Sequence, residues 1–372
     1  MYLRKTLADF LEDRVIYRNL IPTDPALPRL ADIWQEIGLE TFRAPRKTEP
    51  VYAAAAHHFL QAAQANRGLP PLERLLFVGD TPMNDGTSAR NLGEYLPMRG
   101  FIGHEKLAEA KRVDIEGPLM LANRWQALAD FLDWVQTEGF VFDQQTALVL
   151  DLDKTTFGPR GRNDKVIDQA RVTAVRLTAE AFLGNDFDEV ALRSVYDRLN
   201  QLEYHPFTRD NQDYLAYISL MIVGQIYPAE RLWADLESGR LTGIHQFVIL
   251  CDARQAQMSE GLRAAHREVT GNMAKNDPTP FKSFRLHEYH ATVALMDTLP
   301  DDTPQTDLLA QEITMTGEVV EMTEQLAAQG VLTFGLSDKP DEASVPPTEA
   351  AAQGALPLHR VVMKVVGGLD RN

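Results

Sequence analysis

The chain has 372 residues, 44% of them hydrophobic and 24% charged, and its formal net charge is −16. This acidity disfavours nucleic acids and anionic membranes as partners, because both carry negative charge themselves. The length exceeds one typical core, so two domains are expected. The single cysteine, Cys251, excludes an internal disulfide and, as a buried thiol, indicates a reducing cytoplasm. No targeting or membrane-spanning segment is expected, because the most apolar helical stretch, 214–227, is too short and too polar.

The first half of the chain predicts helices and strands in alternation. Lys47 precedes a helix expected at 53–65, where helix-forming residues are concentrated. An apolar strand at 74–78 then runs into the sequence GDTPMND, which carries Asp80 and Asp85. Two further elements of this region, a strand and a helix, are expected at 98–102 and 123–135.

The apolar run 147–150 is the most informative segment. It has the length and continuous hydrophobicity of a buried parallel strand, and it ends in the sequence DLDKT. Asp151 and Asp153 are two residues apart, so in extended backbone their side chains face the same way. Ligands of open α/β sheets bind beyond the carboxyl ends of the strands. The two carboxylates are therefore expected to converge on one cation or one substrate, although a solvated turn would give the same pattern.

The region after this strand reads as mostly helical. Helices are expected at 166–183, 190–202, 214–227 and 259–269, and the segment 158–315 is interpreted as a separate helical domain. Arg160 and Arg162 lie at its start, where a solvated loop is the favoured interpretation over contact with an anionic substrate. The α/β pattern resumes with a helix at 318–329. A strand at 331–336 follows and ends in Ser337, and a last strand is expected at 360–366.

Taken together, DLDKT, GDTPMND and the serine of FGLSDKP resemble motifs of the haloacid dehalogenase superfamily of phosphohydrolases. The segment from Lys47 to Tyr52 is similar to the lysine motif of that family. The resemblance implies a three-layer, Rossmann-like α/β core formed by residues 1–157 and 316–372. It also implies that 158–315 is a helical cap. The order of the motifs departs from the family and corresponds to a circular permutation, with the chain opened between the serine and lysine motifs.

The family resemblance also implies catalytic and metal-binding roles. Asp151 would be the nucleophile that forms an aspartyl-phosphate, and Asp153 would be the general acid and base. The expected cofactor is Mg²⁺, which prefers oxygen ligands. Its ligands would be Asp151, Asp80 and the main chain of Asp153, with Asp85 as a direct ligand or as a residue that orients a bound water.

Three more residues are implied in phosphate binding. Ser337 and Lys47 would hold the oxygens of the phosphoryl group, and Thr155 would support the turn after the nucleophile. Lys364 is the rival candidate for the lysine, although it lies within an expected strand rather than ahead of a helix.

The sequence thus predicts a Mg²⁺-dependent phosphatase that acts on a small phosphorylated metabolite. The acid at Asp153 favours phosphatase over dehalogenase chemistry, because an alkoxide leaving group needs a proton and a halide does not. Two alternatives stay open: a non-catalytic protein of the same fold that binds a ligand or partner, and a phosphoryl-transferase or mutase.

Overall fold

The computed structural model describes residues 1–369, which divide into two compact units. Within these residues, unit 1 consists of 1–169 with 292–369, and unit 2 is Ala170–Ala291. The boundaries expected from the sequence lay at 157/158 and 315/316. The segments 158–169 and 292–315 belong to unit 1 instead, and the helices α6 (Asp164–Leu183) and α13 (Lys282–Val293) each run across a boundary.

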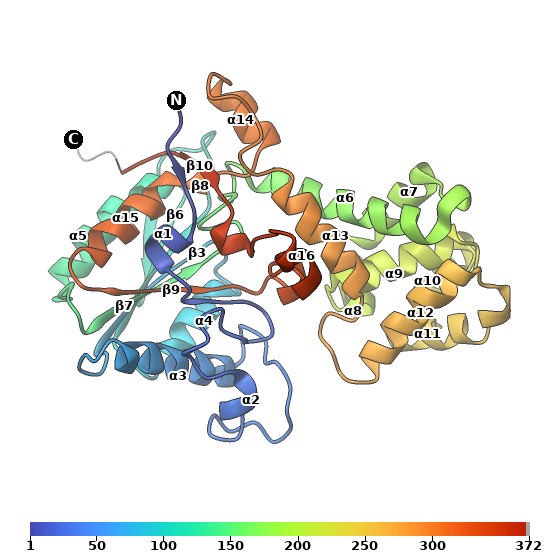
Figure 1. Ribbon diagram of the computed structural model, residues 1–372, viewed down its shortest axis with the longest axis horizontal. Helices are drawn as coiled ribbons and strands as arrows, with labels where there is room; N and C mark the ends of the chain where they lie inside the picture. Colours follow the sequence, from blue (N-terminus) through green and yellow to red (C-terminus); the bar gives the residue numbers. More distant parts are fainter. Residues whose placement is uncertain (370–372) are drawn as a thin grey trace. The chain divides into compact units, whose positions relative to one another are not determined.

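Unit 1 is an α/β structure built on a mostly parallel sheet of seven strands (Figure 1). All neighbouring strands are parallel except the last pair, which is an antiparallel hairpin. In spatial order the strands are β2 (Val15–Ile16), β9 (Leu332–Leu336), β7 (Thr146–Asp151), β3 (Arg74–Gly79), β4 (Met98–Gly103), β6 (Leu119–Ala122) and β5 (Val113–Glu116).

The central strands are buried on both faces. One face of β3 and β7 contributes Leu75, Phe77, Ala147 and Val149 to a core cluster that includes residues of α3 (Pro50–Asn66). The intervening residues of both strands are fully buried too, because side chains alternate between the two faces of a strand. This two-sided burial explains why the strands read as continuous hydrophobic runs.

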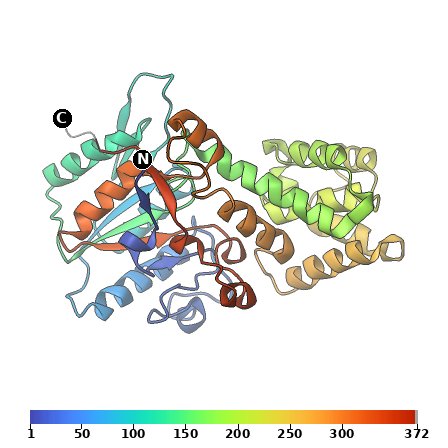
Figure 2. The ribbon, with the colours of Figure 1, turned by 45° about the horizontal axis from the view of Figure 1, so that its top comes forward.

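Helices cover both faces of the sheet. Figures 1 and 2 show α3 on one side of the strands, and α5 (Leu128–Thr137) with α15 (Gly317–Ala327) on the other. The shorter helices of unit 1 are α1 (Ala8–Leu11), α2 (Leu30–Ile33), α4 (Asp85–Leu92), η1 (Trp125–Ala127), α14 (Gln305–Gln311), η5 (Asp341–Ala343), α16 (Thr348–Ala352) and η6 (Leu358–Arg360).

A second, three-stranded sheet brings the two ends of the chain together. Its order is β1 (Arg4–Lys5), β10 (Met363–Val366) and β8 (Met315–Thr316), with β1 antiparallel and β8 parallel to β10. The expected strand at 360–366 is therefore present from 363 onward, but it lies outside the seven-stranded sheet.

Unit 2 is helical, and its residues form no strand. Its helices, with the crossing helices α6 and α13, are η2 (Gly184–Asp186), α7 (Glu189–Leu199), η3 (Leu202–Tyr204), α8 (His205–Thr208), α9 (Gln212–Val223), α10 (Ala229–Glu237), α11 (Ile244–Asp252), η4 (Gln255–Gln257) and α12 (Glu260–Met273). Nearly all of α9 is buried, so it forms the centre of the unit. A buried ion cluster anchors it to α13, where Arg285 binds Asp213 and also Glu288, the latter at 2.6 Å.

Two expectations about the whole chain can be compared with the structure. Cys251 is buried and free, and burial raises the pKa of its thiol to about 12. No helix among the described residues is both long and apolar enough to cross a membrane.

Candidate functional site

The three strands that carry the candidate residues are neighbours in the sheet. Asp151 at the end of β7 pairs with Leu336 at the end of β9, and Leu150 pairs with Val78 in β3. Because the strands are parallel, their carboxyl ends lie at one edge of the sheet. The polar residues that follow each strand are therefore brought to the same place.

The turn after β7 is held by two threonine hydroxyls. Thr156 donates a hydrogen bond to the main-chain oxygen of Asp151 at 2.6 Å, and Thr316 donates one to that of Thr155 at 2.5 Å. Lys154 adopts a left-handed conformation with φ of 66°, which lets the chain reverse directly after Asp153. These contacts fix the Asp151 carboxylate at the strand end, where it is 5% exposed.

The acidic pair after β3 is joined by hydrogen bonds. Asp85 is the first residue of α4, and its Oδ2 accepts from the main-chain N–H groups of Asp80 at 3.1 Å and Thr81 at 2.9 Å. The Thr81 hydroxyl donates to the same oxygen at 2.8 Å. The other oxygen, Oδ1, is thereby left to face Lys47, 2.6 Å from its Nζ.

Gly79 is required for this arrangement. A Cβ at this position would lie 2.4 Å from Cβ and 2.6 Å from Cγ of Asp85, so the start of α4 would have to move.

We expect Gly79→Ala to lower the free energy of unfolding by about 1–3 kcal/mol, as overpacking does. We also expect it to weaken divalent-cation binding, measured by calorimetry. Gly271→Ala is the control for the cation-binding measurement, because it lies in α12 of unit 2 with open space around it and no positive φ. Unchanged cation affinity in Gly79→Ala would contradict this role.

Of the two candidate lysines, Lys47 is the one that lies at the buried carboxylates. It lies in the loop before α3, its side chain is 2% exposed, and its Nζ is 2.5 Å from Oδ1 of Asp151 as well as 2.6 Å from Asp85. The rival Lys364 is bound elsewhere in unit 1, where it pairs with Glu312 and Asp297, each at 3.0 Å.

The burial of these charges shifts their pKa values. Burial and the negative charges of Asp151 and Asp85 raise the pKa of Asp80 from 3.8 to about 9. Burial also raises the pKa of Asp151 to about 7, against the opposing charge of Lys47. For Asp85, burial is outweighed by Lys47 and by hydrogen bonds, and its pKa falls to about 2. With all three carboxylates ionised the cluster would carry more negative charge than Lys47 compensates, and Asp80 and Asp151 therefore hold their protons more tightly than free carboxyl groups do.

Three of the four expected metal ligands form a group. Asp80, Asp85 and Asp151 are all buried and offer carboxylate oxygens within 4.8 Å of one another. Asp153 was expected to contribute its main-chain oxygen rather than its carboxylate, and its side chain, 21% exposed, does not belong to this group. An all-oxygen donor set of this kind fits a hard divalent cation such as Mg²⁺.

Ser337 and Thr155 lie beside this group. Ser337 follows β9 and is 1% exposed, and its Oγ accepts a hydrogen bond from the main chain of Lys339 at 3.1 Å. Thr155 is fully buried in the turn after Asp153. Both are placed at the edge of the sheet where the carboxylates gather, as the strand order requires.

The structure adds two cations that the sequence did not identify as site residues. Lys339 is 2% exposed at its side chain, and its Nζ is 3.6 Å from Oδ1 of Asp153. Arg160 binds Asp80 through its Nε. The expectation of a solvated loop at Arg160 and Arg162 was wrong. Arg162 is 9% exposed at its side chain and binds two glutamates, Glu105 at 2.6 Å and Glu318 at 2.8 Å, which draw it into the interior of unit 1.

The raised pKa values predict a pH-dependent affinity for a divalent cation. Carboxylates bind a cation in their deprotonated form, so the affinity for Mg²⁺ is expected to rise as the pH rises through the pKa values of about 7 for Asp151 and about 9 for Asp80. Calorimetry at several pH values would measure this rise together with the release of protons. Affinity that is independent of pH over this range would contradict the assignment.

The same groups make the stability depend on pH. The folded, metal-free protein retains protons on Asp80 and Asp151 that the unfolded chain, with carboxyl pKa values near 3.8, has released. This contribution to the free energy of unfolding therefore falls as the pH rises from the unfolded pKa to the folded one. Because Mg²⁺ removes the need for those protons, the stabilisation by Mg²⁺ is expected to grow with pH in denaturant titrations.

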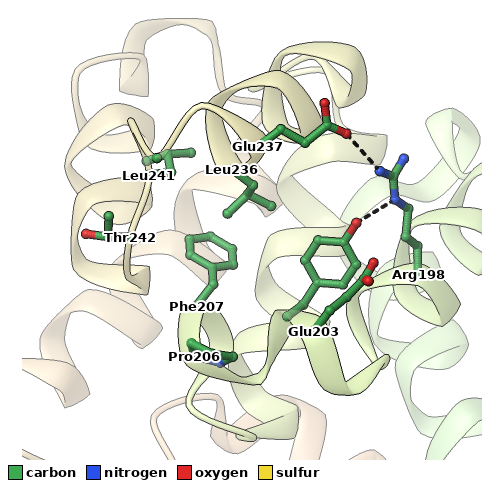
Figure 3. A pocket seen from close by; sticks show the side chains of 10 residues that line it. Arg198, Glu203, Pro206, Phe207, Leu236, Glu237, Leu241 and Thr242 are labelled. Atoms are coloured by element: carbon green, nitrogen blue, oxygen red, sulfur yellow. Dashed lines mark hydrogen bonds and ion pairs between the residues drawn. The ribbon is translucent and has the colours of Figure 1, made fainter.

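Unit 2 contains a separate hollow, which Figure 3 shows from close by. Its polar groups pair with one another: Arg198 donates from Nε to the Tyr204 hydroxyl at 2.9 Å, and its Nη2 lies 3.5 Å from Glu237. The guanidinium also lies over the ring of Trp233, 4.0 Å from its centre. None of these groups belongs to the buried carboxylate group, so we place the candidate site in unit 1.

The comparisons with known proteins identify no relative. The chain matches no protein-family model, and searches of curated proteins and of solved structures found no match either.

Proposed function

We propose that this chain is a metal-dependent phosphohydrolase of the haloacid dehalogenase type, acting on a small phosphate monoester. The observation that carries the proposal is the buried group of Asp80, Asp85 and Asp151, in which Lys47 pairs with Asp85 and Asp151. A group of this composition can hold a divalent cation and, through it, a phosphate. A site for a neutral ligand has no use for three buried carboxylates, because each is costly to remove from water.

In the first step, Asp151 acts as the nucleophile. One carboxylate oxygen of Asp151 forms a bond to phosphorus, and the bond between phosphorus and the oxygen of the leaving group breaks. Asp153 donates its proton to that oxygen, so an alcohol leaves and an aspartyl-phosphate remains. Mg²⁺, when bound by Asp80, Asp85 and Asp151, would supply the positive charge that lets a carboxylate approach an anionic phosphate.

In the second step, water replaces the aspartate. Asp153, now ionised, accepts a proton from a water molecule as the water oxygen bonds to phosphorus. The bond between phosphorus and Asp151 breaks, which releases inorganic phosphate and restores both aspartates. The partial exposure of Asp153 suits this exchange of protons, whereas Asp151 is shielded from solvent.

Ser337, Lys47 and Lys339 have supporting roles in this proposal. The hydroxyl of Ser337 and the ammonium of Lys47 would hold phosphoryl oxygens, and Lys47 also keeps the carboxylates of Asp85 and Asp151 in place. Lys339 lies beside Asp153 and would stabilise its ionised form between the two steps.

The order of the strands supports the family assignment and the proposed permutation. The nucleophile strand β7 lies between the strand of the serine and the strand of the acidic pair, although the chain visits them in the order β3, β7, β9.

Hydrolysis of p-nitrophenyl phosphate by the full chain tests the proposal. We expect release of nitrophenol with Mg²⁺, no release with excess EDTA, and recovery when Mg²⁺ is restored. Product analysis with added alcohol acceptors distinguishes hydrolysis from phosphoryl transfer. The absence of both hydrolysis and Mg²⁺ binding would contradict the proposal.

A further inference from the structure

Arg160 is held in a fixed position beside the carboxylate group. Its main-chain N–H donates to the oxygen of Lys154 at 2.8 Å, and its own oxygen accepts from the N–H of Glu105 at 2.9 Å. The indole of Trp125, which is fully buried, donates to the same oxygen at 3.3 Å. With the backbone anchored in this way, the side chain reaches Asp80 from one constant direction.

Only one edge of the Arg160 guanidinium is used by Asp80. The contact is made by Nε, and the terminal nitrogens Nη1 and Nη2 have no hydrogen-bond partner within residues 1–369. The side chain is 29% exposed, so solvent and solutes reach it. Terminal guanidinium nitrogens in this state present a planar pair of donors, which matches the geometry of a carboxylate or a phosphate.

Arg160 is one of three basic groups at the site, and the proposed chemistry does not use its terminal nitrogens. Lys47 lies between Asp85 and Asp151, and Lys339 lies beside Asp153. In the proposed function the phosphate at Asp151 is met by the divalent cation, Ser337 and Lys47. The terminal nitrogens of Arg160 are therefore the positive group that remains for another part of the substrate.

We propose that Arg160 recognises a second anionic group on the substrate, so that the substrates are phosphate monoesters that also carry a carboxylate or another phosphate. The inference rests on the proposed function, because it places the first phosphate at Asp151. Arg160 is then a residue that determines specificity, in addition to its contact with Asp80.

The test is calorimetric binding of three phosphonates to the full chain with Mg²⁺. Propylphosphonate has a neutral tail, 3-phosphonopropanoate adds a carboxylate, and 1,3-propanediylbisphosphonate adds a second phosphonate. We expect one or both of the doubly anionic compounds to bind about tenfold or more tightly than propylphosphonate, as charged hydrogen bonds do. In Arg160→Gln this ratio of affinities is expected to fall close to one, and Arg160→Lys, which keeps the charge, should recover part of it.

The control is Arg112→Gln, which removes an exposed arginine of unit 1 and should keep the ratio of the unchanged chain. Equal affinity of the unchanged chain for all three compounds would overturn the inference and leave the proposed function standing. The inference would also be overturned if Arg160→Gln kept the higher affinity for the doubly anionic compounds. An equal loss of affinity for all three compounds in Arg160→Gln would overturn it too, because it would indicate that Arg160 only positions Asp80. Failure of every phosphonate to bind would count against the proposed function itself and, with it, this inference.

Discussion

Asp151→Asn is expected to lower Mg²⁺-dependent hydrolysis of p-nitrophenyl phosphate by about 10³-fold or more, the scale seen when one member of a catalytic unit is removed. The amide has nearly the shape of the carboxylate but is a poor nucleophile, so the aspartyl-phosphate cannot form. The measurement is the steady-state rate at saturating Mg²⁺ for both proteins.

The fold of this variant is expected to survive. Burial raises the pKa of Asp151, which means that the folded protein disfavours its ionised form. A neutral amide removes that cost, so the metal-free variant should melt at the same temperature as the unchanged chain or higher. Asp133→Asn, on the exposed side of α5, is the matched control and should keep its activity. Full activity in Asp151→Asn would refute the assignment of the nucleophile.

Lys47→Met is expected to cause the largest loss of stability, about 3–5 kcal/mol at neutral pH and above. Lys47 is the shared partner of the buried carboxylates of Asp85 and Asp151, and removing it leaves both without their cation. Urea denaturation of the metal-free protein measures the loss. The loss should be smaller at mildly acidic pH, because protonation of the carboxylates then relieves their repulsion.

Two further variants separate this effect from a simple packing defect. Adding Asp85→Asn to Lys47→Met removes one of the stranded charges, and part of the lost stability should return. Lys111→Met breaks an exposed pair with Asp130 and should cost less than about 1 kcal/mol. If Lys47→Met lowered the free energy of unfolding by as little as Lys111→Met, the buried ion cluster would not depend on Lys47 for its stability.

The parts of the fold that could be predicted from sequence are those with strong local signals. The strands β3, β7 and β9 are buried on both faces, so each reads as an apolar run. Strand β7 ends in Asp151, and Asp80 and Ser337 directly follow β3 and β9. The hairpin of β5 and β6 was not predicted. Two of the four residues of β5 are exposed, and the strand lacks the apolar run that marked the others. The boundaries of unit 2 were missed because α6 and α13 continue through them without a break in helical pattern.

The candidate site, too, could be predicted only where its residues had a local signal in the sequence. Its aspartates follow strands and could be placed from the pattern, whereas the choice of Lys47 over Lys364 depended on which lysine the fold brings to them. Lys339 could have been noticed in the sequence, since it follows Ser337 by two residues at the end of a predicted strand. Its contact with Asp153, however, depends on the pairing between β7 and β9. Arg160 was considered only as a less favoured contact for an anionic substrate, because its position beside Asp80 is set by the main chain of Glu105, a residue distant in sequence.

The measurement that most directly tests the account is trapping of the covalent intermediate. The full chain would be mixed with p-nitrophenyl phosphate and Mg²⁺, quenched in acid during turnover, digested and examined by mass spectrometry. The account predicts the added mass of one phosphoryl group on the peptide that contains Asp151, absent with EDTA and absent in Asp151→Asn. Turnover with no phosphorylated peptide, or with the group on another residue, would contradict it.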